Sequence, residues 1–137
     1  MNLVNNLPYT TVVQVAMTGN TGRFPLPDNE LLRGRHIIGL YLRKQDGSDS
    51  AVDINNNVLV GEAAVRAMTI NLQVDSTNVI ADTPLETFYT TDFRLYVGLD
   101  LYGFNPQKSY VQVNNTANVT AGEVVELVFV YQAGNGR

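Results

Sequence analysis

Cysteine and tryptophan are absent from this chain of 137 residues, and lysine occurs only twice, at Lys44 and Lys108. Without cysteine the protein can form no disulfide bond, no thiolate metal site and no cysteine nucleophile. The net charge is −4, and the arginines are scattered rather than clustered. A surface that holds nucleic-acid phosphates needs grouped lysine and arginine. We therefore expect no direct binding to nucleic acid.

Charged residues are also scarce, at 16% of the chain against about 25% in an average soluble protein. Asparagine, threonine, glutamine and serine fill the polar positions instead, and such neutral groups cost less to dehydrate than charges. This composition favours a surface partly covered by other chains. No apolar run approaches the roughly 20 residues of a membrane span, and the first residues do not resemble a secretory signal. We expect synthesis in the cytoplasm and no membrane span.

Apolar and polar residues alternate with a period of two in segment after segment. In Phe93–Leu101 the apolar residues Phe93, Leu95, Val97, Leu99 and Leu101 all fall on one face. Side chains of a β-strand point alternately to opposite faces, so this pattern predicts strands that bury one side. About eight such segments are separated by turn residues, and only 61–68 has helix propensity. The sequence predicts an all-β, antiparallel sandwich.

Prolines and turn residues predict where individual strands lie and end. The segment 23–28 holds two prolines, which cannot donate to a β-ladder, so we expect an edge strand or an extended arm. The segment 28–34 predicts one helical turn, capped by Asp28 or Asn29 and ended by Gly34.

The strand expected at 35–43 shows how alternation assigns faces. Strict alternation places His36, Ile38, Leu40 and Leu42 together on the apolar face. The same rule places Ile37 on the opposite face, with Gly39, Tyr41 and Arg43.

The closing strand, Val124–Gln132, differs because both of its faces are apolar. Val125, Leu127, Phe129 and Tyr131 form one face, while the other carries three valines and Glu126. A strand of this kind is central and covered on both sides, either by a loop or by another subunit. Tyr41 and Tyr96 lie on the polar faces of their strands, and tyrosine is enriched at subunit contacts. The predicted subunit interface therefore comprises Tyr41, Tyr96, Val124, Val128 and Val130.

Residues that could carry chemistry are few. His36 is the only histidine, and it begins a strand without a nucleophile elbow, so we expect a core or rim histidine rather than a catalytic base. Asp46, Asp49 and Asp53 surround a Gly-Ser turn and are weak calcium candidates, although their spacing fits no EF-hand loop. Asp82, Glu86, Asp92 and Asp100 cannot be paired from sequence as glycosidase carboxylates. We predict no catalytic residue, no cofactor and no enzyme activity.

Three stretches carry a family resemblance: Arg23–Pro27 continuing through Leu31–Leu40, Lys108–Val111, and Val124–Tyr131. Together with the order of elements, they make the chain similar to the small jelly-roll capsid proteins of icosahedral, tailless bacteriophages. The resemblance implies a single jelly roll of two four-stranded sheets, no enzyme activity, and assembly into a shell or vertex.

The resulting hypothesis is one jelly-roll domain over 1–137, with an N-terminal arm at 1–8 and a flexible tail at 133–137. The resemblance implies a structural virion protein, made in the host cytoplasm, whose partners are copies of itself and other capsid proteins. The alternative is a β-sandwich module that binds carbohydrate or a cell surface, with or without the help of calcium. That alternative predicts an exposed Tyr41 or Tyr96 on which a sugar ring could stack.

Overall fold

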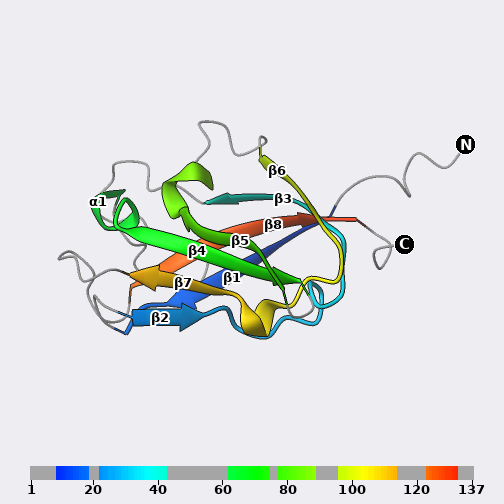
Figure 1. Cartoon of the computed structure of the whole chain (residues 1–137), viewed down its shortest axis with the longest axis horizontal. Coiled ribbons are helices and arrows are strands. Elements are labelled where there is room, and N and C mark those ends of the chain that lie inside the picture. The colour runs from blue at the N-terminus through cyan, green and yellow to red at the C-terminus, as the bar shows by residue number, and fades with distance from the viewer. Residues whose placement is uncertain are drawn as a thin grey trace, which may run out of the picture.

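A computed structural model describes residues 9–18, 22–42, 62–74, 77–88, 96–113 and 123–132. The expected all-β fold is confirmed (Figure 1). The strands are β1 (Tyr9–Ala16), β2 (Gly22–Pro25), β3 (Ile37–Leu42), β4 (Met68–Val74), β5 (Thr77–Pro84), β6 (Val97–Leu101), β7 (Tyr110–Val113) and β8 (Val124–Tyr131). The helical pieces are single turns: α1 (Glu62–Val65), η2 (Leu85–Phe88) and η3 (Pro106–Lys108). The short helix α1 lies in the stretch where helix propensity predicts one.

The strands form two antiparallel, four-stranded sheets that lie one in front of the other in Figure 1. Sheet A has the order β1-β8-β3-β6, and sheet B has the order β2-β7-β4-β5. Strand β2 is an edge strand, as its prolines predict, and it pairs with β7. The predicted antiparallel sandwich is therefore confirmed.

The pairing follows one rule along the chain. Strand β1 pairs with β8, β2 with β7, β3 with β6, and β4 with β5. This is the pattern of one long antiparallel hairpin whose two arms have been folded over together. Further pairing of β8 with β3 and of β7 with β4 joins the pairs into the two sheets.

The core lies between the sheets and is built from the faces that alternation predicts. Sheet A contributes Val13, Val15, Leu127 and Phe129, among others. Sheet B contributes the buried residues of β4 and β7, and Phe88 and Phe104 fill space beside them. The rings of Phe104 and Phe129 pack with their centroids 5.2 Å apart. The alternation of 9–17 places Val13, Val15 and Met17 on one face with Tyr9 and Thr11, and Met17, which continues the inward face of β1, is buried.

Strand β8 is central, as its composition predicts, with β1 on one side and β3 on the other. All eight of its residues are buried, on both faces of the sheet. The central position is therefore confirmed, and the outward side chains of β8 are flanked by those of β1 and β3, as Val128 is by Val12 and Tyr41.

One face assignment is wrong. Ile37 is buried in the core together with Leu40 and Leu42, whereas Ile38 is only partly buried. The physical reason is a register shift between Ile37 and Gly39 in the pairing of β3 with both neighbours. Such an irregularity adds one residue to the strand and reverses the alternation beyond it.

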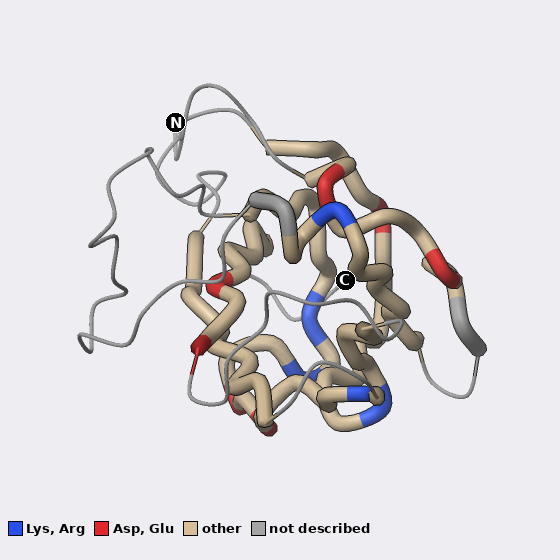
Figure 2. The backbone as a smooth tube through the Cα atoms, turned by 90° about the vertical axis from the view of Figure 1, so that its left-hand side faces the viewer, with Lys and Arg blue, Asp and Glu red and all other residues tan. Residues whose placement is uncertain are grey.

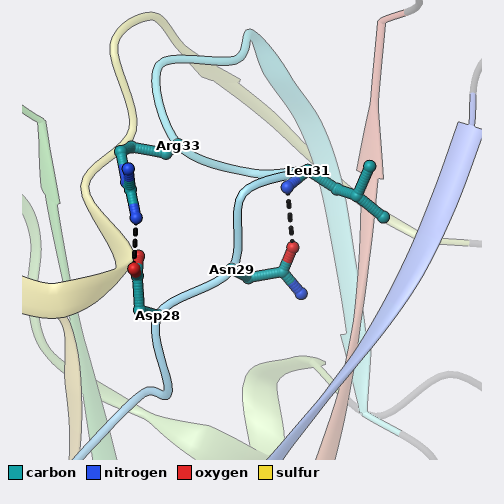
Figure 3. Close-up of polar contacts among 4 residues, drawn as sticks. All are labelled: Asp28, Asn29, Leu31 and Arg33. Carbon is teal, nitrogen blue, oxygen red and sulfur yellow. Dashed lines mark hydrogen bonds and ion pairs between the residues drawn. The ribbon is translucent and has the colours of Figure 1, made fainter.

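The expected turn at 28–34 is confirmed (Figure 3). The side-chain oxygen of Asn29 accepts a hydrogen bond of 2.9 Å from the backbone N–H of Leu31, so Asn29 acts as the cap. Gly34 ends the turn with a φ of 74°. Across the turn, the guanidinium of Arg33 pairs with the carboxylate of Asp28. This hydrogen bond, and secondarily the charge of Asp28, raises the pKa of Arg33 above its ordinary value.

The sequence predicts a short return strand at 78–81, with Pro84 blocking the start of the segment after it, but β5 continues to Pro84. Its pairing with β4 contains two register shifts, and Asp82 adopts a positive φ of 47°. The backbone N–H of Asp82 donates to the side-chain oxygen of Asn71, which is itself buried. Pro84 therefore ends a strand rather than blocking the start of one.

Candidate interaction surface

The predicted subunit interface maps to one place, the outer side of sheet A. The odd-numbered residues of β1 and β8 enter the core, so their even-numbered residues face outward. Val12 is paired with Val128, and Val128 is paired on its other side with Tyr41. We call this surface the valine–tyrosine face, comprising Val12, Tyr41, Tyr96, Val124, Val128 and Val130.

The members of this face differ in accessibility. Val124, Val128 and Val130 are only 2–5% exposed, so the single chain already covers them. Val12 and Tyr96, in contrast, are 38% and 41% exposed, and Tyr41 is partly buried. A partner on this face would therefore contact the valine of β1 and the tyrosines first, with the β8 valines as the floor beneath them.

The position of Tyr96 is set by a glycine on the neighbouring strand. A Cβ atom built on Gly39 would lie 1.9 Å from Cδ2 of Tyr96, so the ring lies directly over the glycine backbone. Gly39 is paired with Gly98, where nothing lies within 4 Å of an added Cβ. The missing side chain at Gly39 thus makes room for the Tyr96 ring against the sheet.

His36 lies at the rim of sheet A, as the sequence predicts for a residue at a strand start. Its Nε2 lies 2.6 Å from a carboxylate oxygen of Asp100, and its ring stacks on Tyr102 with centroids 3.8 Å apart. The backbone oxygen of His36 accepts a hydrogen bond from Gln132. These contacts join the start of β3, the end of β6 and the end of β8. The geometry explains His36 as a residue that holds three segments together.

The outer side of sheet B is different in character. The guanidinium of Arg23 lies 4.7 Å from the centre of the Tyr110 ring, a cation–π contact between β2 and β7. Thr69 of β4 is paired with Gln112 of β7, and Asn71 is paired with Tyr110. Polar side chains therefore occupy the positions that valines occupy on sheet A.

The described acidic residues do not form a site. Asp100 contacts His36, Glu86 lies 3.6 Å from Arg66, and no group of three possible metal ligands exists within the described ranges. The calcium candidates Asp46, Asp49 and Asp53 lie outside the described residues, as do Asp92, the arm 1–8 and the tail 133–137. Figure 2 shows most of the described backbone belonging to uncharged residues, with the acidic and basic ones in short, scattered stretches.

In the parts of the chain that the structure describes, no helix has the length and apolarity needed to span a membrane. Comparisons of the chain with known protein families, curated proteins and solved structures gave no match. The surface itself is therefore the basis for a functional proposal.

Sequence reasoning missed three residues of this region. Val12 belongs to the outward face of β1, and the alternation of 9–17 contained the signal, because it placed only odd-numbered residues inside. The role of Gly39 beneath Tyr96 had no local signal, since it depends on the pairing of β3 with β6. Tyr102 lies one residue beyond its strand, and only the fold places it against His36.

Proposed function

We propose that the protein is a structural virion subunit that assembles with its own copies into the shell, or at the vertices, of an icosahedral phage capsid. The observation that carries this proposal is the valine–tyrosine face, where Val12 and Tyr96 remain exposed beside a floor of buried valines. Exposed apolar side chains gathered on one sheet face favour a protein contact. With charged residues at 16% of the chain, little charge has to be dehydrated on contact.

The fold supports the same proposal. The pairing of β1 with β8, β2 with β7, β3 with β6, and β4 with β5 is the pattern expected of a single jelly roll. A jelly roll is a common architecture of viral shells, and the resemblance noted from the sequence implies the same class. Fold alone never establishes function, so the weight rests on the exposed face.

The experiment compares two double variants of the purified protein by sedimentation and by electron microscopy of assembled particles. Val12→Ser with Tyr96→Ser removes the exposed apolar groups of the face, and we expect self-association to weaken at least about tenfold. Leu31→Ser with Val79→Ser is the matched control, because these residues are 52% and 44% exposed but lie elsewhere. A wild-type protein that stays monomeric and never enters particles would contradict the proposal.

One observation favours a second candidate, a carbohydrate-binding module. The ring of Tyr96 lies against Gly39 and the residue is 41% exposed, so an exposed aromatic side chain is available for a sugar to stack on. A glycan array would detect such binding, and Tyr96→Ala should abolish it. Tyr102→Ala is the control for loss of a similarly exposed tyrosine that is stacked on His36 instead. The absence of binding to every glycan of a broad array would contradict this candidate function.

A further inference from the structure

In the part of the chain that the structure describes, the sandwich has four edge strands, and three of them carry features that disfavour pairing with another strand. Strand β2 has only four residues and includes both Arg23 and Pro25. Strand β5 contains two register shifts, a positive φ at Asp82, and Pro84 at its end. Strand β6 has five residues, carries Asp100 and is out of register with part of β3. Short length, charge, proline and irregularity are the usual means of protecting a sheet edge.

Strand β1, the remaining edge, has none of these features. It spans eight residues of the sequence YTTVVQVA, with no charge, no proline and no glycine. It pairs with β8 over its full length in one unbroken register. Within the described chain, sheet A continues from β1 in one direction only. Five of its residues are β-branched, which favours a further cross-strand partner.

The edge is also open to approach. An open groove of about 530 Å³ lies between β1 and β2, lined by Ala16 and Thr18 on one side and by Arg23 and Phe24 on the other. Strand β2 therefore leaves space beside β1 instead of closing it off. Tyr9, at the other end of β1, is 53% exposed, although its ring contacts that of Tyr131. Both ends of the strand can be reached from solvent.

We infer that the edge of β1 that faces away from β8 binds β1 of a second copy of the chain, antiparallel and about a two-fold axis, so that two A sheets join into one. That the partner is a second copy rests on the self-association proposed above. Charge supports this choice, because β1 is uncharged in a chain of net charge −4, so two copies meet there without opposing like charges. A two-fold contact uses the same surface on both subunits, as a strand paired with itself does.

The alternation of β1 restricts the register of this contact. Val13 and Val15 face the core, and Val12 faces outward. Directly opposed residues of antiparallel strands point to the same face, so odd-numbered residues must oppose odd-numbered ones of the partner. Any other register would move the buried valines of one copy to the outer face.

Hydrogen exchange measured over about a hundredfold range of protein concentration tests the inference, because it reports backbone hydrogen bonds directly. We expect alternate amides of 9–16 to exchange at least about tenfold more slowly at high concentration. The amides of β5 serve as the internal control, and their exchange should not depend on concentration. Sedimentation of the same samples reports the size of the assembly.

A matched pair of variants completes the test. Val12→Lys places a charge on the β1 edge, whereas Val79→Lys places one at a similarly exposed valine of the β5 edge. We expect Val12→Lys alone to remove the concentration-dependent protection and to weaken dimerisation at least about tenfold. Self-association without protection of β1 would overturn this inference and leave the proposed function standing. A chain that remains monomeric and absent from particles would overturn both.

Discussion

The two sheets of this sandwich have similar inner faces but different outer ones. Sheet A presents mainly valines and tyrosines outward, with Gln14 paired with the buried Glu126 among them, and its central strand β8 is buried on both sides. Sheet B presents polar groups at equivalent positions, with Arg23 stacked on Tyr110 and Thr69 beside Gln112. A polar outer face is what a sandwich needs to be stable in water by itself. This difference is the reason why we place the proposed contact with another chain on sheet A rather than on sheet B.

The largest expected effects concern β8. They test whether the side chains on its outer side contribute to the free energy of unfolding, as those on its inner side do. Phe129→Ala removes a fully buried ring and should lower the free energy of unfolding by about 3–5 kcal/mol. Val128→Ala, on the outer side, should cost about 1–2 kcal/mol, because that side chain is buried too. Denaturant unfolding measures both.

Val79→Ala is the control for this comparison, since the same methyl groups are lost from a valine that is 44% exposed. This change should alter the free energy of unfolding by no more than about 0.5 kcal/mol. Equal costs for Val128→Ala and Val79→Ala would break the comparison, because the outer side of β8 would then contribute nothing to the stability of the isolated chain.

An intermediate effect is expected where Tyr96 lies over Gly39. Gly39→Ala introduces a Cβ that collides with the ring, and we expect a loss of about 1–3 kcal/mol. Gly98→Ala, at the paired position with open space above it, should be neutral or slightly stabilising. Adding Tyr96→Ala should recover most of the loss at Gly39. A loss that persists in the double variant would show that the ring is not the cause.

The smallest effect is expected on sheet B and has the opposite sign. The hydroxyl of Thr69 is buried and has no hydrogen-bond partner in the described structure, so Thr69→Val should stabilise the protein by up to about 1 kcal/mol. Thr83→Val is the control, because its hydroxyl donates to the backbone oxygen of Ala81. That change should be neutral or destabilising. Destabilisation by Thr69→Val would indicate that the hydroxyl of Thr69 makes a hydrogen bond in the folded protein.

Alternation was sufficient to predict the strands, because it depends only on which side of each segment is buried. It predicted the inward faces of β1, β4 and β6, the edge position of β2 and the double burial of β8. It was wrong at Ile37 and Ile38. A register shift changes the face of every residue on one side of it, and nothing in a local run of apolar residues marks where one occurs.

The candidate surface was predictable only in part. The unusual composition of 124–130 and the outward tyrosines identified five of its residues from sequence. Their convergence on one face required the pairing of Val128 with both Val12 and Tyr41, which joins strands far apart in the chain. The position of β1 at the edge of the described sheet A could likewise not be predicted from its own sequence, because it depends on which strands pair with it.

The central place of β8 also has a consequence for how the chain folds. It follows the other seven strands in the sequence, yet sheet A has β1 and β3 on either side of it. During synthesis β3 can pair with β6, but β1 cannot join them until β8 is made, so sheet A can be completed only after the last strand. Pairing between such distant segments is typical of slow folding, on the order of milliseconds to seconds.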